Sequence, residues 1–226
     1  MKTVPALAIM AGASSAFAEG LQPITLPKPA KDGGKSVLAA LWERRTTREI
    51  KEDRLPPQVL SDLLWAAFGV NRQAGPMGLP GRTAASASNS QEIDLYVVLP
   101  EGTYLYEAAA HRLVPVVAGD LRAKVGGRGR AGGAAKAPVS LVFVADVTRY
   151  GKARLQEPGL RDPEVQKSYY FVATGLIAGN VYLFAASQGL AAWFHNCNKA
   201  GLAAELKLRP EERVLFAQTV GYPAKS

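Results

Sequence analysis

The feature that most constrains this fold is a run of 24 residues without a charged side chain, from residue 171 to residue 194. Such a run is long enough to cross a membrane as a helix. Ser187, Gln188 and Gly189 interrupt it, however, and glycine is the residue type that most often ends a helix. A helix that is apolar on all sides also occurs at the centre of soluble proteins. We therefore expect a long buried helix over residues 164–187 rather than a membrane span.

The remaining sequence mixes helix and strand signals without a regular alternation of the two. Hydrophobic periodicity, together with capping and breaking residues, predicts helices at residues 36–44, 57–68 and 199–206. Apolar runs predict strands at residues 93–99, 103–106, 139–145 and 214–220, and the turn at residues 100–102 makes the first two a hairpin. This order predicts an α+β fold, with a mostly antiparallel central sheet flanked by helices and the long helix buried at its centre.

The N-terminus has the pattern of a secretory signal. Lys2 precedes an apolar stretch, and Ala16, Phe17 and Ala18 form a small-residue cleavage site. We expect a signal peptide at residues 1–18, an extended arm at residues 19–35 and one domain at residues 36–226, in a periplasmic or secreted protein. The alternative is a disordered or helical N-terminus on a cytoplasmic protein.

Charge and composition restrict the partners without choosing one. The net charge of +8 favours an anionic partner, which could be a phosphate-bearing cofactor, a nucleic acid or a membrane surface. Residues 124–136 contain five glycines and four cations, but no aromatic residue that could stack on a base, so a solvated loop is favoured over a nucleic-acid segment. One cysteine and two histidines make a zinc site improbable.

A cluster of arginines follows the first predicted helix of the domain. Arg44, Arg45 and Arg48 lie within five residues, and the hydroxyls of Thr46 and Thr47 lie between them. Guanidinium groups bind phosphate in a bidentate manner, and three of them repel one another unless an anion is present. The cluster therefore indicates either an anion site or a solvated basic helix end. If the helix continued, Arg44 and Arg48 would share one of its faces.

Three further segments allow both a functional and an ordinary interpretation. The polar loop at residues 81–91 could approach a flat ligand, or could be a Ser-rich connection. His195 and Cys197 are two residues apart, but no orienting carboxylate accompanies them, so a thiol nucleophile is weakly supported. We expect His111 at the surface. The basic tail could return Lys225 to the anion site, or could be a frayed terminus.

Several of these segments, taken in order, resemble the nitroreductase family of flavoproteins. The similarity includes the Arg-Arg-Thr-Thr-Arg cluster at residues 44–48, the loop and strand at residues 82–98, Gly-x-Tyr-x-Tyr at residues 102–106, and Val-Gly-Tyr-Pro at residues 220–223. It covers residues 36–223 and is nearest to the branch that contains azoline dehydrogenases of peptide maturation.

The resemblance implies a homodimer with FMN bound at the subunit interface. It places Arg44, Arg45 and Thr46 on the FMN phosphate, and Arg48 near the pyrimidine edge of the flavin. The other contacts it implies come from Ser86, Ala87 and Asn89 of the partner subunit, from the backbone of Phe194, His195 and Asn196 beside N5, and from Lys225 as a second phosphate ligand.

The activity that the resemblance implies is an FMN-dependent oxidoreduction. Electrons from NAD(P)H or another donor would pass through FMN to a small acceptor such as a nitroaromatic or a quinone, or an azoline-like substrate would be oxidised. No separate catalytic base is needed if the flavin performs the redox chemistry. The alternatives are a flavin-binding protein without turnover and a basic nucleic-acid-binding module.

Overall fold

The computed structural model of the chain describes residues 18–75, 78–126 and 135–224. Almost all of the predicted signal segment, the middle of the segment at residues 124–136, and Lys225 lie outside the described residues.

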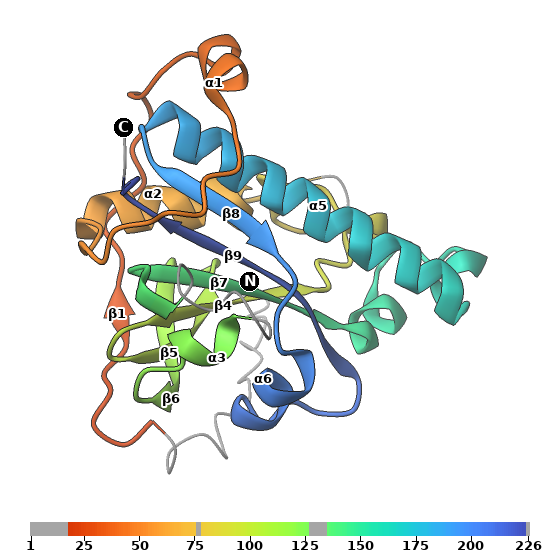
Figure 1. Ribbon diagram of the computed structural model, residues 1–226. Helices are drawn as coiled ribbons and strands as arrows, with labels where there is room; N and C mark the ends of the chain where they lie inside the picture. The colour runs from red at the N-terminus through yellow and green to blue at the C-terminus, as the bar shows by residue number, and fades with distance from the viewer. Residues whose placement is uncertain (1–17, 76–77, 127–134, 225–226) are drawn as a thin grey trace, which may run out of the picture.

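A seven-stranded sheet organises the molecule, in the order β1-β6-β5-β4-β7-β9-β8 (Figure 1). Its strands, in that order, are Ile24–Thr25, Arg112–Ala118, Gly102–Glu107, Ile93–Leu99, Val139–Asp146, Glu212–Gly221 and Ala191–His195. Every neighbouring pair is antiparallel, as predicted. β7 is buried along its whole length, and six of its eight side chains are apolar, on both faces of the sheet. A separate two-stranded sheet pairs β2 (Val70–Arg72) with β3 (Gly81–Arg82).

Helices lie on both faces of the large sheet and enclose two apolar cores. On one face, α5 (Pro163–Ser187) packs together with α2 (Pro57–Phe68) and with α1 (Val37–Glu43) near its C-terminal end (Figure 1). On the other face, α3 (Arg122–Val125) and α6 (Lys199–Glu205) cover a second cluster that includes Val142 and Ala217. Short 3₁₀ turns occur at η2 (Ala87–Asn89), η3 (Val147–Lys152) and η4 (Pro158–Arg161). The α+β fold expected from the sequence is confirmed.

The long uncharged run forms most of α5, as predicted, and then enters β8, but only one side of the helix is buried. Its N-terminus is capped by the Asp162 carboxylate, which accepts from the Glu164 amide, and Gly189 follows its C-terminus with φ +69°. Ala173, Ile177 and Val181 point to the core, whereas Val172 and Leu176 on the opposite side are exposed. By length and composition α5 could cross a membrane. Its packing against α2 and the sheet is instead that of a core helix of a folded domain.

The helix α1 ends before the arginine cluster at residues 44–48 begins. The Ser36 hydroxyl accepts from the Ala39 amide and begins the helix, as the sequence predicts. The helix ends at Glu43, because Arg44 adopts a non-helical backbone with ψ 117°. Arg44 and Arg48 therefore do not share a helical face. The large apolar residues of α1 are exposed, and Trp42 is 91% accessible, whereas Ala40 is buried.

The arm that precedes α1 crosses α2 and covers His111. The Ala30 amide donates to Asp62, and the Gln58 side chain donates to the Lys28 carbonyl. The His111 ring is 2.9 Å from the Tyr106 hydroxyl, 2.7 Å from the Ser61 hydroxyl and 3.1 Å from the Pro27 carbonyl. The expectation that His111 lies at the surface is therefore only partly met, because the residue is half-buried where the arm and α2 contact its ring. This partial burial lowers the pKa of His111.

Candidate functional site

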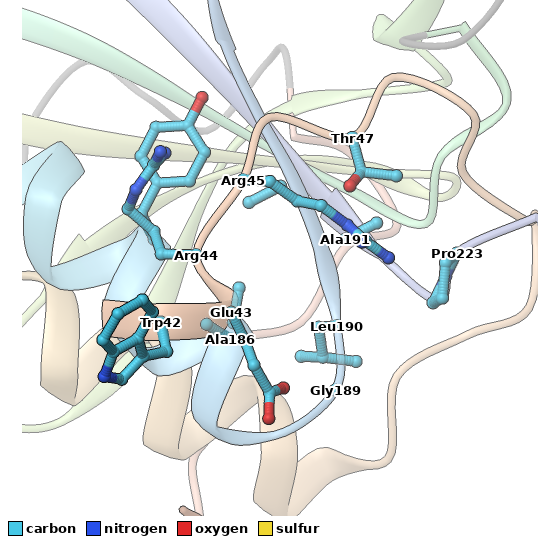
Figure 2. A pocket seen from close by; sticks show the side chains of 13 residues that line it. Trp42, Glu43, Arg44, Arg45, Thr47, Ala186, Gly189, Leu190, Ala191 and Pro223 are labelled. Carbon is cyan, nitrogen blue, oxygen red and sulfur yellow. The ribbon is translucent and has the colours of Figure 1, made fainter. Parts of the chain in front are cut away.

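A cavity of about 440 Å³ lies where the end of α1, the end of α5, the start of β8 and the C-terminal tail meet (Figure 2). Its walls include Arg44, Arg45 and Thr47 after α1, Tyr182 on α5, and Pro223 in the tail. Gly189 and Ala191 form part of the floor and leave room beside the backbone. Segments that are distant in sequence therefore form one polar hollow next to the edge of the sheet.

Arg44 and Arg45 give this cavity its positive charge. Figure 2 shows their side chains leaving the chain in different directions, with Arg45 reaching over Ala191. The Arg44 guanidinium carbon lies 5.4 Å from the centroid of the Tyr182 ring. Among the described residues neither guanidinium forms an ion pair. Glu43 also lines the cavity, but its carboxylate is paired with Lys35. The cavity thus presents two uncompensated positive charges, an arrangement suited to an anion.

The two threonines of the arginine cluster connect it to β8 and α5. The Thr47 amide donates to the Ala192 carbonyl at 2.9 Å, and its side chain lines the cavity. Thr46 does not line the cavity, and its hydroxyl lies 3.0 Å from the Tyr182 hydroxyl. The Tyr182 hydroxyl also accepts from the Phe194 amide at 2.8 Å. The chain after α1 is thereby connected to the outer edge of the sheet at two points.

β8 is the last strand of the sheet, so alternate backbone groups point away from β9. The bonds of the Ala192 carbonyl and the Phe194 amide to groups outside the sheet show that these two residues face outward. β8 ends at His195, and if its alternation continues for one more residue, the next outward amide belongs to Asn196. We find no hydrogen-bond partner for that amide among residues 18–75, 78–126 and 135–224. An N–H donor is therefore available at the edge of the sheet, two residues beyond Phe194.

The His195 side chain is turned into the protein. Its Nδ1 lies 2.8 Å from the Asn196 carbonyl, which can only accept, so Nδ1 carries the proton. Nε2 then accepts from the Thr219 hydroxyl at 2.9 Å. Burial lowers the pKa of His195 and favours this neutral form. The ring packs on Trp193, with 4.4 Å between centroids, and does not line the cavity.

Arg48 and Cys197 lie outside the cavity as well. The Arg48 guanidinium carbon is 5.8 Å from the centroid of the Trp193 ring, beside β8. The Cys197 thiol is buried and free, and this burial raises its pKa to about 11. A thiol held in its protonated form is a poor nucleophile.

The loop that contains Ser86, Ala87 and Asn89 does not line the cavity of its own chain. Its backbone is strained, with positive φ at Ser88 (49°), Asn89 (50°) and Gln91 (51°). Side chains hold this shape. The backbone amide of Gln91 donates to the Ser86 hydroxyl at 2.9 Å, and Arg82 Nε donates to the side-chain oxygen of Gln91 at 2.6 Å. Side-chain contacts thus fix an unusual backbone shape at a position away from the cavity.

The described part of the C-terminal tail lies beside the arginine cluster. The Ala224 amide donates to the Glu49 carbonyl at 2.9 Å, and the Lys51 amide donates to the Tyr222 carbonyl at 2.8 Å. Pro223 lines the cavity, and Lys225 lies outside the described residues. The described part of the tail therefore reaches the cavity, which it contacts through Pro223.

Tyr182 is the residue of this site that the sequence did not assign. A signal was present, because Thr174, Asn180 and Tyr182 are polar residues in an otherwise apolar helix. The hydroxyl partners of Tyr182, at Thr46 and Phe194, become visible only in the folded chain.

Comparison with known proteins finds relatives that match almost the whole domain. The nitroreductase family profile matches residues 41–222. A curated protein of Methanocaldococcus jannaschii that is named as a nitroreductase is 29% identical over 162 residues, which is 66% of this chain and 73% of the relative.

Solved structures give the same result. A crystal structure from Ralstonia eutropha, described as a nitroreductase, has 38% sequence identity and a TM-score of 0.79, and the match covers 90% of both chains. The NADPH:FMN oxidoreductase of Vibrio harveyi shares the fold at 17% identity with a TM-score of 0.57, covering 84% of this chain and 69% of that one. With its profile match and its antiparallel α+β fold, this chain belongs to the nitroreductase family, a family of oxidoreductases.

Proposed function

We propose that this protein is an FMN-dependent oxidoreductase of nitroreductase type, with the FMN phosphate held in the cavity between α1 and β8. The proposal rests mainly on one observation, the two guanidiniums at the cavity that have no acidic partner among the described residues. A phosphate dianion would neutralise both, and the small residues Gly189 and Ala191 leave space for it. The residues present therefore fit the phosphate group of FMN.

Each residue near the cavity has a task in this proposal. Arg44 and Arg45 hold the phosphate from the cavity wall, and Lys225 is a second phosphate ligand. Thr46 adds its hydroxyl from the rim, since it stands in the chain between the lining residues Arg45 and Thr47. Arg48 lies near the pyrimidine edge, where its charge favours an anionic reduced flavin. The outward amide of Asn196 is the N–H donor toward N5, since the Phe194 amide is already bound to Tyr182. When bound, FMN supplies the transfer of hydride or single electrons.

The proposal also includes a homodimer. The exposed side of α5 carries Phe171, Val172 and Leu176, an apolar surface that is unusual on a protein acting alone. At Gly175 and Gly179 an added Cβ would meet nothing within 4 Å, so another helix could approach closely there. Ser86, Ala87 and Asn89 of the partner subunit would then contact the flavin, in keeping with their distance from the cavity of their own chain.

The electron partners follow the same proposal. NAD(P)H or another reductant donates electrons, and a nitroaromatic or a quinone accepts them, or an azoline-like substrate is oxidised. Action outside the cytoplasm, after cleavage at Ala18, is part of the proposal and would favour a donor other than NAD(P)H.

The test begins with the colour of the purified full-length protein. We expect a yellow protein whose visible bands bleach under dithionite and return in air, and which reduces a nitroaromatic or a quinone. The double variant Arg44→Ala/Arg45→Ala should fold but release FMN on gel filtration. The matched control is Arg161→Ala/Arg213→Ala, which removes two exposed arginines at the ends of α5 and β9 that lie away from the cavity. This control should retain FMN.

The other outcomes separate the competing functions. Normal FMN retention in the Arg44→Ala/Arg45→Ala variant would refute the phosphate assignment. A yellow protein that passes electrons to none of the three substrate classes would be a flavin-binding protein without turnover. A colourless protein that retains DNA in a salt-sensitive manner would support the nucleic-acid-binding alternative.

A further inference from the structure

The Tyr182 hydroxyl joins three elements that meet at the cavity. It accepts from the Phe194 amide on β8 at 2.8 Å and lies 3.0 Å from the Thr46 hydroxyl after α1. The ring of the same residue lies under the Arg44 guanidinium. Ring and hydroxyl therefore make separate contacts, and a substitution by phenylalanine can separate their effects.

Elementary chemistry fixes the direction of one of these hydrogen bonds and permits Tyr182 to donate in the other. A backbone N–H can only donate, so the Tyr182 oxygen is the acceptor in its bond with Phe194. The phenolic hydrogen is then free to donate to the Thr46 oxygen, which lies within hydrogen-bond distance. With Tyr182 as the donor, Thr46 keeps its own hydroxyl hydrogen, and because Thr46 is exposed beside the arginines, this hydrogen can be donated to an anion. Successive donors of this kind strengthen one another.

We propose that Tyr182 is a positioning residue for the phosphate of FMN, acting through the hydroxyl of Thr46. This inference rests on the proposed function and adds a residue to it. Although Tyr182 lines the cavity, the role proposed for it is indirect, because its hydroxyl is already engaged with Phe194 and Thr46. It orients the Thr46 hydroxyl so that its hydrogen points to the phosphate, and it fixes the segment after α1 to the edge strand that carries the Asn196 amide.

The test compares FMN with riboflavin, which has the same ring but no phosphate. The flavin-free full-length chain is titrated with each, and flavin fluorescence is followed for the wild type, Tyr182→Phe, Thr46→Val and the double variant. We expect Tyr182→Phe and Thr46→Val each to weaken FMN binding about three- to tenfold, the loss of one net hydrogen bond. Riboflavin binding should change less than twofold. The double variant should bind FMN no more weakly than either single variant, because the two substitutions break the same chain of hydrogen bonds.

Two controls address a purely structural effect. Tyr106→Phe also removes a hydrogen-bonded phenol, the one that contacts His111, and should bind FMN like the wild type. Thr46→Ser keeps the hydroxyl and should restore affinity. A measurement without flavin tests the bond itself: amide hydrogen exchange at Phe194 should be faster in Tyr182→Phe than in the wild type.

The outcomes that would overturn the inference are distinct. If Tyr182→Phe binds FMN as the wild type does, or weakens FMN and riboflavin equally, Tyr182 does not act on the phosphate. If the losses from Tyr182→Phe and Thr46→Val add, the two residues act independently. If the wild type binds FMN and the Arg44→Ala/Arg45→Ala variant does not, a failure at Tyr182 leaves the proposed function standing. A wild-type chain that binds no FMN overturns both.

Discussion

Individual polar residues near β8 are held in one protonation state by burial and by specific partners. His195 is kept neutral between the Asn196 carbonyl and the Thr219 hydroxyl, and the Thr219 hydroxyl lies 3.2 Å from that of Ser140. The Cys197 thiol is kept protonated in the second apolar core. Two residues whose types invite a catalytic explanation therefore stabilise the fold instead.

The thiol gives the first prediction. With its pKa raised to about 11, only about one thiol in a thousand would be ionised at pH 8. We expect Ellman's reagent at pH 8 to leave Cys197 largely unmodified in the native protein and to modify it within minutes in guanidinium chloride. Rapid modification of the folded chain would show that the thiol is accessible.

At this scale the sequence could predict residue types but not their partners. The arginine cluster was identified because three guanidiniums in five residues are unusual, and two of them line the cavity. The role of Tyr182 could not be identified, because its partner Thr46 is 136 residues away in the chain. His111 was assigned to the surface because nothing in its own neighbourhood shows that the arm covers it.

Among the elements, α5 has two faces with different properties. The face toward the sheet is packed, and the other exposes apolar residues around Gly175 and Gly179. Hydrophobic periodicity predicted the helix and its ends, but it could not predict that one apolar face would have no partner within the chain. The same holds for α1, whose apolar residues were recognised as a helical stripe and are exposed.

The open face of α5 gives the second prediction. Gly175→Glu should leave the fold of each chain intact, because its Cβ meets no atom within 4 Å and glycine is the weaker helix former by about 0.5–1 kcal/mol. It should convert the proposed dimer into a monomer, measured by size-exclusion chromatography with light scattering. Gly151→Glu, in an open position on η3, is the control and should remain dimeric. A dimeric Gly175→Glu protein would place the subunit interface elsewhere.

Strand prediction succeeded for four long strands of the large sheet and missed others, including β6 and the short apolar strand β8. β4, β5, β7 and β9 were predicted close to their observed bounds. β6 was not predicted, because Pro115 stands in its middle and proline donates no ladder hydrogen bond. The structure accommodates Pro115 at a shift in register, where Tyr104 pairs with Pro115 and Thr103 pairs with Val117.

At the scale of the whole molecule, the site depends on long-range folding. The cavity forms because the chain after α1 runs along the outer edge of β8 while the tail pairs with residues 49–51. The sequence identified several of these segments separately. Their meeting point follows from the strand order, in which β9 brings the C-terminus beside β8, and strand order is not encoded in local patterns.

The third prediction concerns the global stability of the protein. Burial lowers the pKa of both histidines, so between pH 7.5 and pH 5.5 the unfolded chain takes up more protons than the folded chain. The free energy of unfolding should therefore decrease as the pH falls through 6.5. We expect a lower Tm at pH 5.5 than at pH 7.5, and a smaller difference in His111→Gln/His195→Gln. An equal difference in the variant would mean that other groups cause the pH dependence.

The edge position of β8 has one more consequence. An apolar outer strand with unpaired backbone groups is a template on which another chain can add a strand and begin to aggregate. Here the Thr47 amide donates to the Ala192 carbonyl, and the Tyr182 hydroxyl accepts from the Phe194 amide. The contacts that shape the cavity therefore also protect the newly folded chain from misassembly before any ligand arrives, which links solubility in the cell to the integrity of the binding site.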